Sequence, residues 1–164
     1  MAEIIQTMDS RRVFVDTLKE LAKTNDKICV VISDVGFNYL SGDLPFRVLN
    51  VGAAEQNAAV ISCALSLEGW SVFCYSMINF ALFRCGEQVR NGAVFHKTPV
   101  TFLGVKGGPA YKFLGTGHNL LHDKEDFNFC DNIGLKWHNP QSNEEVKQAV
   151  LESYHSGKPS YIRL

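Results

Sequence analysis

The chain has 164 residues, 46% of them hydrophobic, and its 16 basic residues almost balance its 17 acidic residues. This balance provides no charged surface that would attract nucleic acid or an anionic membrane, so neither is expected as a partner. The length is that of one domain with one substantial core, which we expect to span residues 1–164.

Hydropathy and cysteine usage indicate the compartment. No signal-peptide pattern opens the chain, and no apolar run approaches the length of about 18 residues that a membrane helix needs. The predicted location is therefore the cytoplasm. The five cysteines have no CxxC spacing and mostly lie within apolar runs, which favours buried, reduced thiols over disulfides or a zinc site; they are Cys29, Cys63, Cys74, Cys85 and Cys130.

The first third of the chain predicts one helix and two strands. Residues 1–9 read as a short lead and residues 10–24 as a helix, because apolar residues recur there at helical spacing. A continuous β-branched run over residues 28–33 predicts a strand that is covered on both faces. Residues 36–45 read as a loop, and residues 47–51 as the next strand.

The segment of residues 58–67 carries small or apolar side chains almost all round. A helix of this composition is buried on most of its sides. It therefore either crosses the interior of the domain or meets another subunit.

The rest of the chain alternates strands and helices. Ser142, with Glu145 three residues later, predicts a capping box at the start of the last helix. Residues 106–123 are rich in glycine and too long for an ordinary connection, which indicates a binding role. Strands that alternate with helices predict an α/β fold with a doubly wound, mainly parallel sheet and helices on both faces. The remaining strands are expected at residues 72–75, 99–105, 135–137 and 161–164, and the remaining helices at 79–93 and 125–132.

One acidic residue stands at a position where such sheets bind ligands. The apolar run that ends at Val51 is followed by Gly52, small residues and then Glu55, which opens a helix. Glu55 is therefore expected at the carboxyl edge of the sheet. A simpler interpretation of Glu55 alone is an acid favoured by the dipole of its helix.

Several segments carry a resemblance to a known family, and two of them, residues 28–34 and 44–47, resemble its first strand with an acidic end and its "FP.R" lead-in. The string NVGAAEQN at residues 50–57 resembles the VGIAEQN signature of the pyrimidine-binding domain of transketolase-like, thiamine-diphosphate-dependent enzymes. Residues 80–91 resemble the "F...R..(D/E)QiRn" helix of that family, and residues 158–164 resemble its "gP.yiRl" closing strand. The segments come in family order over nearly all of the chain. The chain is therefore identified as a member of this family, and it is similar to the small, C-terminal-section subunit of a split transketolase. The resemblance implies the thiamine-diphosphate-binding fold.

The resemblance also implies which residues contact the cofactor, thiamine diphosphate. The glutamate that matches Glu55 hydrogen-bonds the ring nitrogen N1′ of the aminopyrimidine and favours the 4′-imino tautomer, which can remove the thiazolium C2 proton. Phe80 matches the aromatic residue that stacks on the ring, and Met77 occupies a position usually held by another phenylalanine. Asp34 matches a family acid near the cofactor.

A histidine of the glycine-rich segment is the candidate substrate residue. His118 resembles the histidine of the family's "THQ" motif, which touches the sugar near the reacting carbon, and is therefore expected to be both a catalytic and a substrate residue. His122 is a competing alignment. The neighbourhood departs from the family, since Leu114 replaces an acid, Gly117 replaces a threonine, and the following acidic pair is displaced to residues 125–126.

The diphosphate half of the cofactor site is missing from the sequence. In the resembled family a GDG triplet with a downstream asparagine binds the metal, but the Gly42–Asp43 pair is followed by Leu44. No metal ligand is therefore expected in this chain, and Mg²⁺ or another divalent metal is expected on a separate, GDG-bearing subunit. The resemblance implies activity only together with that partner. Self-association through the pyrimidine-binding domain is expected because the apolar helix after Glu55 and the helix of residues 80–90 would otherwise expose an apolar surface.

The expected function is that of the pyrimidine-binding subunit of a heteromeric transketolase, which transfers a two-carbon ketol unit between sugars. The small-molecule substrate is a sugar phosphate or a ketoacid. One alternative is a subunit of a ketoacid decarboxylase, a dehydrogenase or a deoxyxylulose-phosphate-synthase-like enzyme. Another alternative is a degenerate, non-catalytic binding module. The retained Glu55 disfavours it, because an acid at an apolar interface is costly and a domain without a cofactor has no evident need for it.

Overall fold

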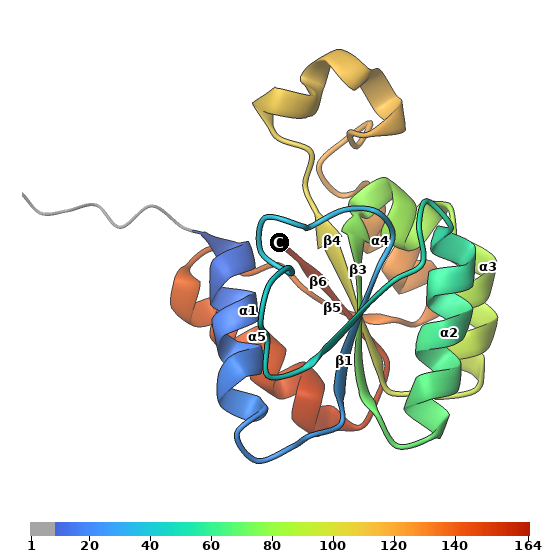
Figure 1. Cartoon of the computed structure of the whole chain (residues 1–164). Helices are drawn as coiled ribbons and strands as arrows, with labels where there is room; N and C mark the ends of the chain where they lie inside the picture. The colour runs from blue at the N-terminus through green and yellow to red at the C-terminus, as the bar shows by residue number, and fades with distance from the viewer. Residues whose placement is uncertain (1–8) are drawn as a thin grey trace, which may run out of the picture.

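The structure, a computed structural model, describes residues 9–164, apart from the side chain of Ala110. The expected lead therefore lies outside the described residues, except for Asp9. The six strands form one parallel sheet in the order β2-β1-β3-β4-β6-β5. Helices cover both of its faces, with α1 and α5 on one and α2, α3 and α4 on the other (Figure 1). The predicted doubly wound parallel sheet is confirmed.

The strands are β1 (Ile28–Ile32), β2 (Arg47–Asn50), β3 (Ser71–Met77), β4 (Val100–Val105), β5 (Lys136–His138) and β6 (Ser160–Arg163). The α-helices are α1 (Ser10–Leu21), α2 (Glu55–Leu67), α3 (Gly86–Gln88), α4 (Glu125–Ile133) and α5 (Asn143–Ser156). Two π-helical segments, η1 (Asn79–Phe83) and η2 (Val89–Phe95), flank α3, and a 3₁₀ segment, η3 (Pro109–Gly117), follows β4. No helix within residues 9–164 combines the length and the apolarity that crossing a membrane requires.

Two helices begin at side-chain caps, one of which the sequence analysis predicts. Asp9 Oδ1 accepts a hydrogen bond from the backbone N–H of Arg12 at 3.2 Å at the start of α1. Ser142 Oγ accepts one from the N–H of Glu145 at 3.2 Å, and Glu145 Oε2 accepts one from the N–H of Gln141 at 2.7 Å. The predicted capping box is therefore present, with its return bond one residue before the cap.

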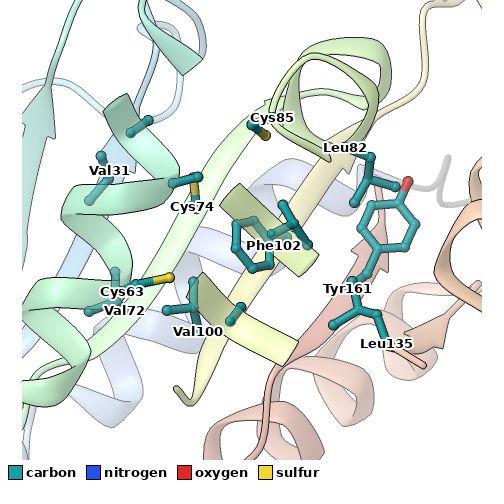
Figure 2. Packing of buried hydrophobic residues seen from close by; sticks show 14 of the residues in the cluster. Val31, Cys63, Val72, Cys74, Leu82, Cys85, Val100, Phe102, Leu135 and Tyr161 are labelled. Carbon is teal, nitrogen blue, oxygen red and sulfur yellow. The ribbon is translucent and has the colours of Figure 1, made fainter. Parts of the chain in front are cut away.

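The sheet separates two apolar cores. All five residues of β1 are buried, as its β-branched sequence predicts. Phe14 and Leu18 of α1 pack with Phe73 on one face. Figure 2 shows part of the other core, in which Cys74, Phe102 and Tyr161 pack together. The five cysteines are buried free thiols, as expected.

The helix expected at residues 79–93 is present as η1, α3 and η2, which together run from Asn79 to Phe95. The N–H of Arg84 donates to the carbonyl of Asn79, five residues earlier, at 3.0 Å, and the N–H of His96 donates to Asn91 in the same way at 3.3 Å. These are π-helical bonds, so the expected helix is present but is π-helical over most of its length. π-bulges often occur at functional sites, because each inserts an extra residue into a turn.

Helix α2 lies on the surface of the sheet. Ala58, Ala59 and Ser62 face the core and are buried, whereas Val60 is 54% and Leu67 71% exposed. A path through the interior of the domain, one of the two expected alternatives, is therefore wrong for this helix. The other alternative, contact with another subunit, stays a prediction.

Residues 106–123 form a projection that we call the arm. The arm leaves the end of β4, passes through η3 and returns to α4, and it stands clear of the helical layers (Figure 1, yellow to orange). Its exposed apolar side chains include Phe113 and Leu121. The expectation of an unusually long connection is confirmed, and the binding role expected for it stays a prediction.

Candidate active site at the carboxyl edge of the sheet

The predicted site residues gather at the carboxyl edge of the sheet. The chain leaves β1 toward β2 on one side and later adds β3 on the other, so the ends of β1 and β3 flank the point where the strand order reverses. Asp34 follows β1, Met77 ends β3, and Glu55 begins the helix after β2. His118 lies in the arm that follows β4.

A side chain that the sequence analysis did not single out fixes the turns around Glu55. Asn50 Oδ1 accepts hydrogen bonds from the N–H of Asp34 at 3.1 Å and from the N–H of Gly52 at 2.9 Å. Gly52 has a φ of 72°, a conformation that a glycine adopts without strain. Asn50 therefore joins the end of β1 to the turn that presents Glu55.

Glu55 is a buried carboxylate with a cationic partner. Only 5% of Glu55 is exposed, and Arg84 Nη1 donates to both of its oxygens, at 3.1 Å to Oε1 and 3.0 Å to Oε2. The guanidinium carbon of Arg84 lies 4.2 Å from the centre of the Phe80 ring. Sequence analysis did not identify Arg84 as a site residue, because its partner is 29 residues away in the chain.

The structure brings Phe80 together with His118. Their ring centres are 4.9 Å apart and the rings are nearly perpendicular, with an interplanar angle of 82°. The other aromatic neighbour of His118 is Tyr111, whose ring is nearly parallel at 6.4 Å. His122 is exposed, and its backbone carbonyl accepts from the N–H of Glu125 at the start of α4. Of the two competing histidines, His118 is therefore the one that lies against Phe80.

The arm is bound to the start of η1 by an amide side chain. Asn79 Nδ2 donates to the carbonyl of Thr116 at 2.8 Å and to that of Asn119 at 3.3 Å. At Gly107 the arm approaches itself closely, since a Cβ there would lie 2.5 Å from the carbonyl oxygen of His118. The position of His118 is thus set by hydrogen bonds and close packing within the arm and at its base.

A pocket of about 490 Å³ opens beside these residues, between the arm and the loop after β1. Asp34 and Met77 line it, as does Tyr111, the ring neighbour of His118. Arg11 and Lys106 add two cationic side chains to its wall. Glu55 and Phe80 are not among its lining residues, so the predicted cofactor residues form two adjoining groups rather than one cluster.

A buried ionic network ties the arm to the sheet, and sequence analysis missed it. Asp126 is fully buried and accepts hydrogen bonds from the Tyr161 hydroxyl at 2.7 Å and from Arg163 Nε at 3.0 Å; Arg163 Nη2 also donates to it. Arg163 Nη2 donates to the carbonyl of Asp123 at 2.6 Å, and Lys106 Nζ donates to Asp123 Oδ1 at 2.7 Å. Asp126, one of the displaced acidic pair at residues 125–126, is therefore engaged in this buried network.

Burial and charge perturb the titration of two groups in this network. Burial raises the pKa of the Tyr161 hydroxyl well above its usual value, and the negative charge of Asp126 acts in the same direction. The hydrogen bond and the charge of Lys106 lower the pKa of Asp123, and Arg163 adds to this effect. Within residues 9–164, no three carboxylate, imidazole or thiol side chains lie close enough together to bind a metal ion.

An open parallel sheet with a buried carboxylate and an aromatic side chain at its carboxyl edge defines a ligand-binding domain of the doubly wound α/β class. The sequence model of the transketolase pyrimidine-binding domain matches residues 6–164. The chain therefore belongs to the transketolase pyrimidine-binding domain family.

The curated relatives of this chain are longer than the chain itself. An apulose-4-phosphate transketolase subunit of Phocaeicola vulgatus is 38% identical over 117 residues, which cover 69% of this chain and 38% of that protein. 1-Deoxy-D-xylulose-5-phosphate synthase 1 of Geobacter sulfurreducens is 31% identical over 156 residues, which cover 92% and 24%. A solved structure described as a split gene transketolase, inactive beta4 tetramer, has a TM-score of 0.80 at 26% identity and covers 94% of this chain and 50% of that chain. The chain spans less than half the length of the curated relatives that it matches most strongly.

Proposed function

We propose that this chain is the pyrimidine-binding part of a thiamine-diphosphate-dependent transketolase, which transfers a two-carbon ketol unit between sugars. The observation that carries the proposal is the buried Glu55 carboxylate beside the Phe80 ring at the carboxyl edge of the sheet. Membership of the family supports it, as does the name of the Phocaeicola vulgatus relative, a transketolase subunit.

These residues fit the aminopyrimidine half of the cofactor. A carboxylate shielded from water can share a proton with a weakly basic ring nitrogen, and an aromatic ring offers a flat surface for stacking. Glu55 would share the proton at N1′ of the bound ring, and Phe80 would provide the surface on which the ring stacks. When bound, the cofactor supplies the carbanion chemistry that side chains cannot provide.

The pocket between the arm and the loop after β1 suits the substrate. Arg11 and Lys106 place a guanidinium and an ammonium in its wall, and such groups bind the phosphate of a sugar phosphate or the carboxylate of a ketoacid. His118 approaches the pocket through Tyr111 and is the candidate to hydrogen-bond a substrate hydroxyl or carbonyl near the reacting carbon. Met77 and Asp34 complete the pocket wall on the side of β1 and β3.

The diphosphate and the divalent metal are assigned to a separate, GDG-bearing subunit. The Gly42–Asp43 pair lies in an exposed loop and lacks the remainder of that motif. The Phocaeicola vulgatus relative is named as one subunit of a transketolase, which supports an arrangement with more than one kind of subunit. Self-association is supported by the exposed apolar residues Val60 and Leu67 on α2.

A second candidate activity is that of a deoxyxylulose-phosphate-synthase-like enzyme, which removes carbon dioxide from a ketoacid. The match to the Geobacter sulfurreducens synthase over 92% of this chain favours it. The two candidates differ in donor, since one takes its two carbons from a ketose phosphate and the other from a ketoacid.

Reconstitution tests both candidates. The chain is used as bait in native extract, the GDG-bearing protein that it captures is purified, and the two are combined with thiamine diphosphate and Mg²⁺. We expect ketol transfer from a ketose phosphate with both proteins present and no turnover with either alone. Carbon dioxide release from pyruvate instead would favour the second candidate, and turnover by the isolated chain would refute the division of the site between subunits.

A further inference from the structure

The Glu55 carboxylate has one side-chain partner among the described residues, and that partner is Arg84. A single nitrogen, Nη1, donates to both oxygens at 3.1 and 3.0 Å. This bridging contact restricts rotation of the carboxylate about its last bond, because rotation would lengthen one of the two hydrogen bonds. The carboxylate has about four lone-pair positions, so the contact leaves others for a ligand.

Burial makes the partner necessary. An ionised carboxylate that is 5% exposed loses most of its hydration, and this is costly unless a charge and hydrogen bonds replace the water. Arg84 supplies both, while 49% of its own side chain stays exposed. The guanidinium therefore compensates the buried charge without being buried itself.

Two features fix Arg84 in turn. The π-helical bond from its N–H to the carbonyl of Asn79 shifts its side chain relative to a regular helix. The face of Phe80 lies 4.2 Å from its guanidinium carbon, a cation–π contact. Because Phe80 also contacts His118, the arm and Glu55 are joined through Arg84.

We propose that Arg84 is a positioning residue that orients the Glu55 carboxylate for proton sharing with the aminopyrimidine of the cofactor. The proposal rests on the proposed function. Arg84 does not itself exchange a proton in this role. It fixes which lone pairs of Glu55 face the ligand, and Phe80 fixes Arg84.

The pairing is tested first in the isolated chain, without cofactor. Arg84→Met, Glu55→Gln and the double variant are unfolded in urea and compared as a double-mutant cycle. We expect Arg84→Met to raise the unfolding equilibrium constant about 10-fold in the wild-type background and less than about 3-fold in the Glu55→Gln background. Arg47→Met is the matched control, because Arg47 lies 5.3 Å from the ring of Trp70 but forms no salt bridge with a described carboxylate. Equal effects of Arg84→Met in both backgrounds would refute the pairing.

The positioning role is tested in the reconstituted enzyme by the exchange rate of the cofactor C2 proton at saturating cofactor. Misplacing a catalytic group by about 1 Å costs about 10²-fold in rate, so we expect Arg84→Met to slow exchange by roughly 10- to 100-fold. Arg84→Lys should recover exchange to within roughly 10-fold of wild type, because one ammonium can also donate to both oxygens. Arg84→Met should cause no further loss in the Glu55→Gln background.

Two outcomes would overturn the positioning role. One is wild-type exchange in Arg84→Met, and the other is an equal loss on adding Arg84→Met to Glu55→Gln. Absence of cofactor-dependent exchange in the wild-type assembly would refute the proposed function, and with it this role. The urea cycle in the isolated chain would still report whether the ion pair forms, so the two failures are distinguishable.

Discussion

The buried carboxylate of Asp126 provides a sharp test of how the arm is attached. Asp126→Asn preserves the shape of the side chain, removes its charge and turns one acceptor oxygen into a donor. Both oxygens of Asp126 accept hydrogen bonds in the structure, from Tyr161 and from Arg163. At least one of these hydrogen bonds must break in the variant.

The magnitude follows from the burial of Arg163. The Arg163 side chain is 7% exposed, and the substitution removes the closer of its two counter-charges, since Asp123 Oδ1 stays 3.3 Å from Nη1. Breaking a buried ion pair by removing one partner costs about 3–5 kcal/mol. We expect a loss at the lower end, about 3 kcal/mol in the free energy of unfolding, because Arg163 keeps its hydrogen bond to the carbonyl of Asp123 at 2.6 Å.

Urea unfolding of the isolated chain measures this loss. Asp16→Asn is the control, since Asp16 forms an exposed ion pair with Lys19 and its loss should cost no more than about 0.5 kcal/mol. Combining Asp126→Asn with Arg163→Met also removes the buried cation that has lost its closer counter-charge, and it should recover part of the stability. A loss below about 1 kcal/mol for Asp126→Asn would contradict a buried, charge-dependent network.

Four further outcomes are expected. The isolated chain should bind thiamine diphosphate weakly or not at all in titration calorimetry, and micromolar, Mg²⁺-dependent binding would contradict a divided site. In the reconstituted enzyme, Glu55→Gln should lower the C2 exchange rate about 10²- to 10⁴-fold, whereas Phe80→Ala should mainly raise the dissociation constant of the cofactor. Leu67→Lys should reduce self-association measured by sedimentation, because it places a charge on an exposed apolar surface of α2. A wild-type chain that is strictly monomeric at high concentration would contradict this expectation. Because the pKa of Asp123 is lowered, its contribution to stability is fully present above the usual value of 3.8 and is lost as the pH falls through the lowered value. Acidification should therefore make the arm more accessible to an acid-active protease. Lys106→Met removes the main cause of the lowered pKa, so cleavage of the arm should increase less on acidification in this variant than in the wild type.

The order of the elements and the edge on which the site lies follow from the sequence. The β-branched run that forms β1, the glycine before Glu55 and the capping serine of α5 each have a local physical cause, so a short window is enough to interpret them. The position of Glu55 at the carboxyl edge also depends only on which element follows which. The placement of His118 against Phe80 adds support to one of two alignments that the sequence left open.

The ion pairs that the sequence analysis did not predict join residues that are distant in the chain. The partner of Glu55 is 29 residues away and that of Asp126 is 37 residues away, and in each case a folded sheet is needed to bring the charges together. The π-helical turns have no hydrophobic period of their own, because η1 and η2 differ from an α-helix only in which carbonyl each N–H reaches. A buried aspartate in an amphipathic helix also resembles any first-turn acid until its burial is known.

The attachment of the arm at its base has a consequence for how this family can diversify. Lys106 and Asp123 are 17 residues apart in sequence but 2.7 Å apart in space, and Asn79 and Phe80 hold the returning part of the arm at Thr116, His118 and Asn119. Closing a loop of twice the length costs only about 0.6 kcal/mol more. The exposed part of η3 around Tyr111 and Phe113, which lies outside these contacts with the base, can therefore be lengthened, shortened or exchanged while the sheet keeps its stability, and we expect differences in substrate preference between relatives to concentrate there.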